Sequence, residues 1–230
     1  MLVNNLSSNS NIPNFTHSCQ LENIFEEALL ETVPEFLKGL TQLPTTANLN
    51  EVVFSQEFVT SLNRILIHNP KGILAVSEYT DIYTVGANPG KRVDIAFVSS
   101  TQGAFKIKLY TVEAKRLPTG TGNRETEYIY GHFNNGSPSG GIQRFKSGDH
   151  GFGLSKSALL GYVEKYNFFH WHTTINDWII AKATELPDWN NNEQLQKLEI
   201  SACGKYSISR SVADRLSDTI DLFHFWIKIP

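Results

Sequence analysis

Cysteine is scarce in this chain of 230 residues, where only Cys19 and Cys203 occur. Two cysteines are too few for a disulfide framework or for a zinc site built from cysteines, so we expect a reducing, cytoplasmic location. No apolar run approaches the roughly 20 residues that cross a membrane, and the N-terminus lacks the basic start and apolar core of a signal peptide. The sequence therefore predicts a soluble protein without a membrane partner.

An excess of basic residues is also missing, because 20 Lys and Arg residues stand against 23 Asp and Glu residues, giving a net charge of −3. A protein of this charge has no global field that attracts nucleic acid, so an enzyme acting on DNA or RNA needs a local basic patch. The sequence also lacks the Gly-x-Ser-x-Gly elbow of one class of hydrolases and the lysine-containing phosphate loop of nucleotide hydrolases.

What the sequence does contain is enough apolar material for one packed domain, with 40% hydrophobic and 11% aromatic residues. Residues 1–18 are rich in Ser and Asn and predict a disordered arm, and residues 19–230 are expected to form a single domain. Apolar residues recur at helical spacing over residues 21–43, where Pro34 predicts a kink or two short helices, and again over residues 53–67.

Strands dominate the remaining prediction. The first three are expected at residues 73–79, 92–99 and 104–117, with a turn at residues 87–90. A long glycine-rich loop then reaches about residue 153, and loops of this length are usually functional or mobile. Two helices and three further strands complete the prediction, in that order, at residues 154–166, 170–184, 195–201, 205–209 and 220–229. The pattern indicates an α/β (α+β) domain with a mixed central β-sheet flanked by helices.

Two of the expected strands carry charged residues inside otherwise apolar runs. Asp94 lies in one strand, and Glu113 and Lys115 lie in the next. Side chains alternate along a strand, so Glu113 and Lys115 point the same way, and Asp94 can lie beside Glu113 if the strands pair. A buried carboxylate is costly unless something pairs with it. Two carboxylates and an ammonium at one point can hold a divalent metal and orient a water against a phosphodiester.

At these residues the chain resembles the PD-(D/E)XK nucleases, the restriction-endonuclease-like superfamily. Asp94 matches the first acidic position and Glu113-Ala114-Lys115 matches (D/E)-x-K, whereas Val93 stands where a proline is frequent. The resemblance covers about half the chain. It implies a restriction-endonuclease-like fold, DNA as substrate, and Mg²⁺ or Mn²⁺ held by Asp94, Glu113 and the backbone carbonyl of Ala114. It also implies that Lys115 orients and helps to deprotonate the attacking water, in a nuclease of restriction or anti-phage defence.

Further site residues follow from the same resemblance. A third acidic group is common on the helix before the first strand, and Glu57 is our candidate, with Glu78 as its rival. Some branches place a functional Gln on the helix after the E-x-K strand, which Gln143 matches. Arg144 and Lys146 lie in the same segment and are expected to bind phosphates. The alternative for this segment is an ordinary glycine-rich turn with exposed polar side chains.

Basic residues flank the proposed site and can supply the local patch that the net charge does not. Arg116 is our further candidate for nucleic-acid binding. Lysines on an edge strand also oppose aggregation, which is an equally ordinary explanation. Cutting both strands of a duplex favours a homodimer, since one site cuts one strand. The basic residues concerned are Lys91, Arg92, Lys106, Lys108, Lys115, Arg116 and Lys146.

Two alternatives to a nuclease stay open. A restriction-endonuclease-like fold also serves as a non-catalytic subunit that binds nucleic acid or a partner protein in a defence or toxin complex. An unrelated α+β interaction protein would use Glu113 and Lys115 as a surface ion pair. Metal binding at Asp94 and Glu113 separates a nuclease from the last class. In a nuclease, Ala at either acidic position is expected to abolish cleavage with little loss of stability, because like charges converge there.

Overall fold

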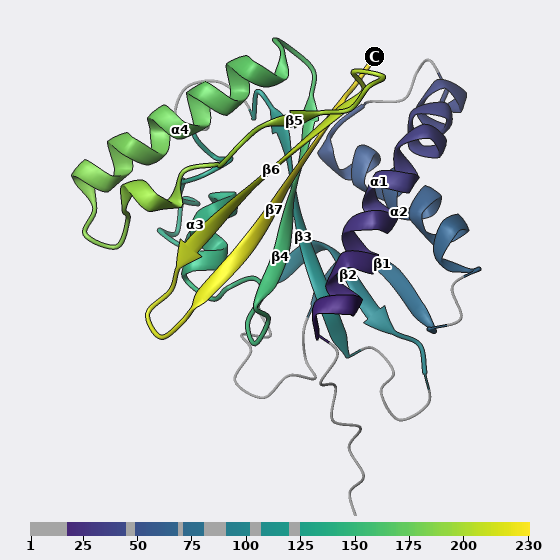
Figure 1. Ribbon diagram of the computed structural model, residues 1–230, viewed down its shortest axis with the longest axis horizontal. Helices are drawn as coiled ribbons and strands as arrows, with labels where there is room; N and C mark the ends of the chain where they lie inside the picture. The colour runs from purple at the N-terminus through teal and green to yellow at the C-terminus, as the bar shows by residue number, and fades with distance from the viewer. Residues whose placement is uncertain (1–17, 45–48, 69–70, 81–90, 102–106, 120–124) are drawn as a thin grey trace, which may run out of the picture.

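The computed structural model describes residues 18–44, 49–68, 71–80, 91–101, 107–119 and 125–230. Within these ranges, seven strands form one mixed sheet in the order β1-β2-β3-β4-β7-β6-β5 (Figure 1). The strands are β1 (Ile73–Thr80), β2 (Arg92–Ser99), β3 (Lys108–Leu117), β4 (Lys156–Val163), β5 (Glu199–Ile200), β6 (Tyr206–Asp214) and β7 (Thr219–Lys228). The helices are α1 (Ser18–Gln42), α2 (Glu51–Leu66), α3 (Gly141–Lys146) and α4 (Phe168–Glu185), with the 3₁₀ helix η2 (Asn191–Glu193).

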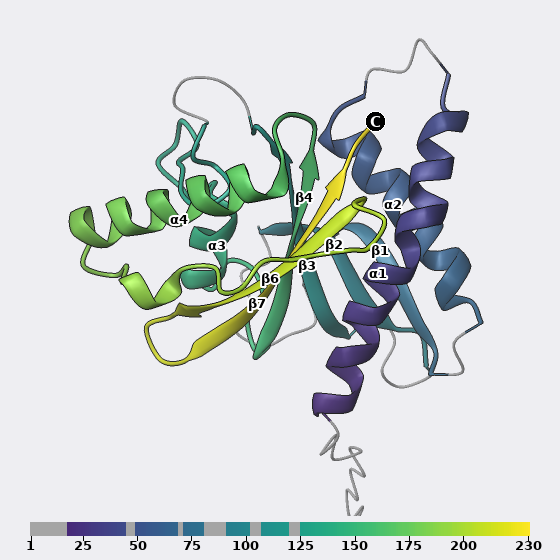
Figure 2. The same cartoon turned by 45° about the horizontal axis from the view of Figure 1, so that its top comes forward.

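Helices cover both faces of the sheet, so the chain forms three layers. Helices α1 and α2 lie together on one face, and α3 and α4 lie on the other (Figures 1 and 2). The core under α1 and α2 is rich in aromatic rings, and the ring centroids of Phe54 and Tyr162 are 5.1 Å apart. Helix α1 continues as one helix through Pro34. No helix in the described ranges is both long and apolar enough to span a membrane.

The first three strands form the meander that the sequence predicts. Strand β1 pairs antiparallel with β2, and β2 pairs antiparallel with β3. Helix α2 begins just before them, where the side chain of Asn50 accepts a hydrogen bond from the amide of Val53 and so caps the helix. This cap matters for the site, because it fixes Glu51 in the first turn of α2 at the edge of the meander.

The prediction of a helix at residues 154–166 is wrong, because most of this segment forms strand β4. Strand β4 pairs in parallel with β3 on one side and with β7 on the other, and seven of its eight residues are buried. A strand covered on both faces reads as a continuous apolar run rather than an alternating one. Such a run cannot be distinguished from a buried helix by periodicity alone.

The long loop expected before residue 153 is partly regular and well packed. It contains α3, and four of its own apolar side chains are buried in the core on this face of the sheet: Tyr128, Ile129, Ile142 and Phe145. The N-terminal arm up to residue 17, the turn at residues 87–90 and the expected strand start at residues 104–106 lie outside the described residues. Helix α4 and strand β7 agree with the sequence prediction, whereas the strand expected at residues 195–201 is reduced to the two residues of β5, and β6 runs on to Asp214, beyond the expected end at residue 209.

Candidate active site

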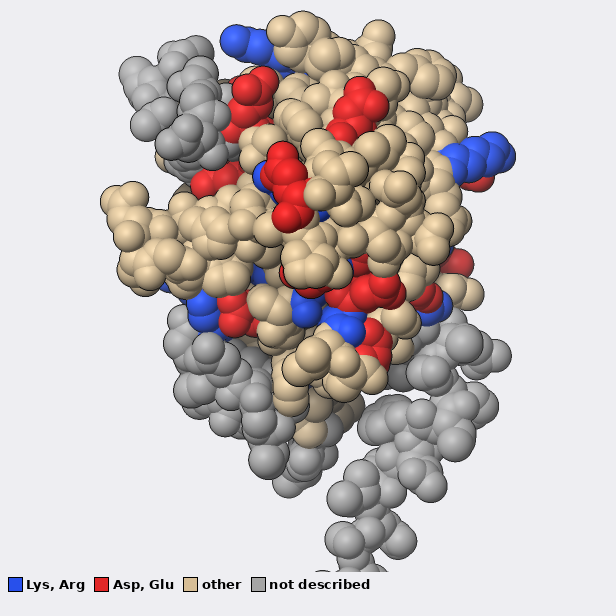
Figure 3. Space-filling model, turned by 90° about the vertical axis from the view of Figure 1, so that its left-hand side faces the viewer, with Lys and Arg blue, Asp and Glu red and all other residues tan. Residues whose placement is uncertain are grey.

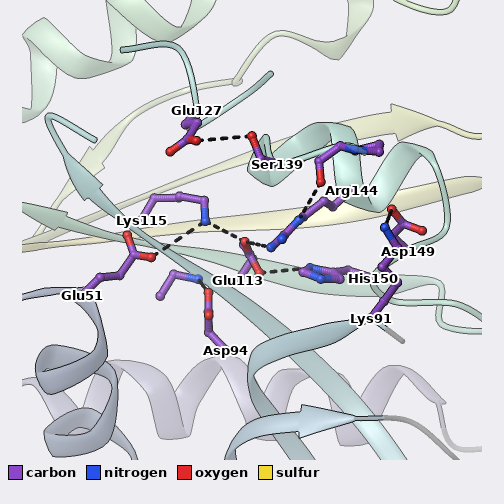
Figure 4. Close-up of polar contacts among 12 residues, drawn as sticks. Glu51, Lys91, Asp94, Glu113, Lys115, Glu127, Ser139, Arg144, Asp149 and His150 are labelled. Atoms are coloured by element: carbon purple, nitrogen blue, oxygen red, sulfur yellow. Dashed lines mark hydrogen bonds and ion pairs between the residues drawn. The ribbon is translucent and has the colours of Figure 1, made fainter. Parts of the chain in front are cut away.

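Asp94 lies where the sheet opens on both sides of strand β2. Toward β1, the pairing includes Ser77 with Ile95 and Tyr79 with Val93 but skips Asp94. Toward β3, the ladder ends at the pair Ile95 and Val112. The carboxylate of Asp94 replaces the missing strand contact, because its Oδ2 accepts a hydrogen bond of 2.7 Å from the backbone amide of Ala114 (Figure 4). Continuing the register places Asp94 opposite Glu113, as the sequence predicts.

Glu113 is fully buried and is the centre of the cluster. Its Oε1 accepts hydrogen bonds of 2.7 Å from Nζ of Lys115 and 2.7 Å from Nη1 of Arg144. Its Oε2 lies 3.0 Å from Nδ1 of His150, which is also buried. Strand β3 supplies Glu113 and Lys115 from one face, while α3 supplies Arg144 and the following loop supplies His150 (Figure 4).

Lys115 is enclosed by acidic groups. Besides its contact with Glu113, its Nζ lies 3.9 Å from Oε1 of Glu51 at the start of α2. The other carboxylate oxygen of Glu51 accepts a hydrogen bond of 3.1 Å from the backbone amide of Arg116. Glu51 therefore links the N-terminus of α2 to the end of β3 that carries the E-x-K tripeptide.

The two carboxylates have opposite electrostatic properties. Burial and the neighbouring charge of Glu113 raise the pKa of Asp94 well above its ordinary value. Burial also acts to raise the pKa of Glu113, but Lys115, His150 and Arg144 outweigh it and hold that pKa well below the usual range. Burial acts to lower the pKa of Lys115, yet Glu113, Glu51 and Asp94 together raise it. Lys115 therefore stays an ammonium at neutral pH.

An open hollow of about 700 Å³, which we call the main hollow, borders the cluster around Glu113. Its lining includes Asp94 and His150 together with the basic residues Lys91, Arg92 and Arg144. The remaining lining residues are Thr80, Phe133, Asn135 and Ser137. Phe133 is exposed, and its ring centroid lies 5.2 Å from the guanidinium of Arg144. The hollow thus offers cations and one aromatic surface beside the carboxylates.

The structure keeps Glu57 away from this cluster. Its Oε1 accepts a hydrogen bond of 3.3 Å from Oγ of Ser61 on the same helix, and its side chain packs against Gly39 of α1. Glu78 lies nearer, beside Asp94 and Glu51 in a small adjoining hollow. Glu78 has a left-handed backbone with φ of 52° at the point where β1 skips its pairing to Asp94. Residues with such strain often gather at functional sites.

The polar residues predicted on and around α3 separate into different environments. Arg144 contacts Glu113, as described, whereas Gln143 turns to a second hollow, where its Oε1 accepts a hydrogen bond from the amide of Gly131. Lys146 is buried in an ion pair with Glu193 and does not line the main hollow. Arg116 makes a two-point ion pair with Glu164, with Nη2 2.6 Å from Oε2.

The basic patch expected around the site is therefore smaller than the sequence suggests. Lys91, Arg92 and Arg144 face the main hollow, and Lys91 is paired with Asp149 at 3.2 Å. Lys106 lies outside the described residues. On the face drawn in Figure 3, Lys and Arg side chains stand beside Asp and Glu side chains.

Two residues of the cluster, Glu51 and His150, escaped the sequence analysis. A signal for Glu51 existed, because Asn50 is a good N-cap residue and an acid follows it in the first turn. For His150 the only signal was its position in the long glycine-rich loop, where functional residues are frequent. It lies 37 positions after Glu113 in a loop, so only the folded chain brings the two side chains together.

A hard divalent cation fits this donor set in its chemistry. Asp94 and Glu113 offer the carboxylate oxygens that Mg²⁺ and Mn²⁺ prefer, and Oε2 of Glu113 is buried without a hydrogen-bond partner among the described residues. A cation would also relieve the repulsion that raises the pKa of Asp94. Within the described ranges, however, no three His, Cys, Asp or Glu side chains are already gathered closely enough to hold a metal.

Comparison of the chain with protein-family models, with curated proteins and with solved structures finds no match.

Proposed function

We propose that the protein is a metal-dependent nuclease with a restriction-endonuclease-like core, and that it hydrolyses phosphodiester bonds in DNA. The observation that carries the proposal is the meeting of Asp94, Glu113 and Lys115 where β2 and β3 separate, beside an open hollow. An ordinary surface ion pair does not explain this arrangement, because Glu113 is fully buried and Lys115 nearly so.

Each residue has a distinct role in this proposal. Asp94 and Glu113 would hold Mg²⁺ or Mn²⁺. When bound, such an ion would polarise the phosphate and make a water molecule more acidic. Lys115 orients the attacking water and offsets negative charge that develops on the phosphoryl group. Its raised pKa argues against a role as the base that takes the proton. Glu51 holds the Lys115 ammonium toward Glu113.

The main hollow is the proposed path of the nucleic acid. Lys91, Arg92 and Arg144 can contact phosphate oxygens there. Phe133 stands at the edge of the hollow on a tight turn, in which its amide donates to the carbonyl of Ser137 and its carbonyl accepts from the amide of Gly136. An aromatic ring held this way can stack on an unpaired base.

A second candidate, a non-catalytic subunit with the same fold, is favoured by one observation. Lys115 and Arg144 already satisfy Oε1 of Glu113, so the cluster forms an ion-pair network without any metal. Such a network can simply stabilise the fold. A protein of this kind would bind nucleic acid or a partner protein without cleaving it.

Cleavage and binding measured side by side separate the two candidates. The assay offers labelled single-stranded DNA, duplex DNA and RNA with Mg²⁺, Mn²⁺, Ca²⁺ or a chelator. We expect cleavage with Mg²⁺ or Mn²⁺, and binding without cleavage in Ca²⁺. Lys115→Ala should lower turnover more than affinity, whereas Lys91→Ala should lower affinity more than turnover. Binding without cleavage in every metal would support the non-catalytic subunit instead.

A further inference from the structure

His150 and Glu113 form a buried pair of polar groups that the protein leaves incomplete. Both ring nitrogens of His150 and Oε2 of Glu113 are buried, and none has a hydrogen-bond partner among the described residues. Nδ1 and Oε2 lie 3.0 Å apart, and no third polar group among the described residues bonds to either atom. Buried polar atoms are nearly always satisfied, so such a group calls for a missing water or ion.

The spacing of the two atoms suits neighbouring ligands of one metal ion. In an octahedral site with bonds of about 2.1 Å, adjacent donors lie roughly 3.0 Å apart, because the edge is about 1.4 times the bond length. His150 also lines the main hollow, as Asp94 does, so the pair lies directly behind the wall of this hollow. Figure 4 shows the His150 ring reaching Glu113 from the side opposite Lys115.

The other oxygen of Glu113, Oε1, is fixed by hydrogen bonds, which suits a carboxylate that binds a metal through one oxygen only. Oε1 accepts hydrogen bonds from Lys115 and Arg144, which fix the carboxylate with Oε2 toward His150. Ligating carboxylates are commonly held by such outer hydrogen bonds, and these contacts tune the metal site. Lys115 and Arg144 can therefore keep their contacts while Oε2 binds the ion.

We infer that His150 is a metal ligand beside Glu113 and that it makes the site selective for Mn²⁺ over Mg²⁺. An imidazole nitrogen suits transition metals, whereas Mg²⁺ strongly prefers oxygen donors. The inference rests on the proposed metal site and adds a nitrogen ligand that the E-x-K resemblance does not assign. Asp94, which lines the same hollow from β2, is the candidate for the third ligand.

The test measures metal binding directly, in the full chain and without nucleic acid. Pulsed electron paramagnetic resonance of the Mn²⁺-loaded protein should show coupling to a ¹⁴N nucleus. The coupling should disappear in His150→Ala and in His150→Gln, and it should persist in His132→Ala, which removes an exposed histidine that contacts Gln143. Thermal unfolding of each variant shows that it is folded.

Calorimetric titration gives the selectivity. We expect Mn²⁺ affinity to fall at least about tenfold in both His150 variants, while Mg²⁺ affinity changes less than about threefold. No Mn²⁺ binding, bound Mn²⁺ without ¹⁴N coupling, or unchanged Mn²⁺ affinity in His150→Ala overturns the inference. Cleavage assays separate this result from the proposed function: cleavage without a nitrogen ligand leaves the nuclease standing, and a nitrogen ligand without cleavage leaves the metal site standing.

Discussion

At the scale of single residues, Asp94 and Glu113 are not equivalent, although the sequence suggests that they are. Their adjacency follows from strand pairing and side-chain alternation, which the sequence contains. Their pKa values shift in opposite directions, because burial and Glu113 raise that of Asp94, whereas Lys115, His150 and Arg144 lower that of Glu113. Arg144 and His150 come from outside the two strands, so this difference cannot be read from strand pairing. The two positions should therefore respond differently to substitution, and alanine should not cost equally little stability at both.

Removing the charge of Asp94 should stabilise the metal-free protein. Because its pKa is higher in the folded than in the unfolded chain, Asp94 favours folding most below its unfolded value near 3.9, and that contribution is lost as pH rises through the folded pKa. Asp94→Asn should thus match the parent near pH 3 and exceed it in stability at pH 7. Urea unfolding at both pH values measures the difference, and a variant less stable at pH 7 would contradict this assignment.

Removing Glu113 should have the opposite effect. Glu113→Ala leaves Lys115 and Arg144 without their shared buried partner. Loss of one member of a buried ion pair typically costs about 3–5 kcal/mol. Urea unfolding at pH 7 tests this, with Glu57→Ala as the control, because Glu57 lies on α2 outside the cluster. Equal stability of the two variants would mean that the buried pairs contribute little.

At the scale of elements, β4 shows what a sequence cannot specify. Its apolar run is compatible with helix or strand, and only the neighbours β3 and β7 decide the outcome. The same limit applies to α3, where residues 141–146 sit among glycines and loop residues and form a helix that brings Arg144 to Glu113. Local patterns gave the meander, but contacts distant in sequence built the rest of the site.

Two glycines test the packing around these elements. A Cβ at Gly161 of β4 would lie 2.4 Å from Cδ1 of the buried Trp226, so Gly161→Ala should cost about 1–3 kcal/mol. A Cβ at Gly39 of α1 would meet mainly the movable carboxylate of Glu57. Gly39→Ala should therefore be neutral or stabilising, since alanine favours a helix by about 1 kcal/mol. Thermal unfolding of the two variants measures the difference, and an equal loss of stability in both would contradict this account of the packing.

At the scale of the whole molecule, the stability of the fold depends on a histidine that stays neutral at the centre of the sheet. His224 of β7 is fully buried, with Nδ1 2.9 Å from the hydroxyl of Tyr128 and Nε2 2.8 Å from Oγ of Ser211. Burial lowers the pKa of His224 to about 3. The unfolded chain binds a proton at this residue below about pH 6.5, and the folded chain does not.

Stability should consequently fall as the solution is acidified. Because the pKa of His224 is lowered in the fold, the free energy of unfolding falls by about 1.4 kcal/mol for each pH unit below 6.5, or by about 2 kcal/mol at pH 5. Urea unfolding of the parent and of His224→Gln at pH 7 and pH 5 isolates this contribution, because other groups titrate in both proteins. A parent that loses no more stability than the variant would show that His224 is protonated in the fold.

The central claim is that Asp94 is part of a metal-dependent cleavage site, and one measurement tests it most directly. Cleavage of labelled DNA with Mn²⁺ or Mg²⁺ is compared between the parent, Asp94→Asn and the neighbouring acidic control Asp149→Asn, all shown to be folded. We predict metal-dependent cleavage by the parent and by Asp149→Asn, and a loss on the order of 100-fold or more in Asp94→Asn. Full cleavage by Asp94→Asn, or equal cleavage by the parent in a chelator, would contradict the account.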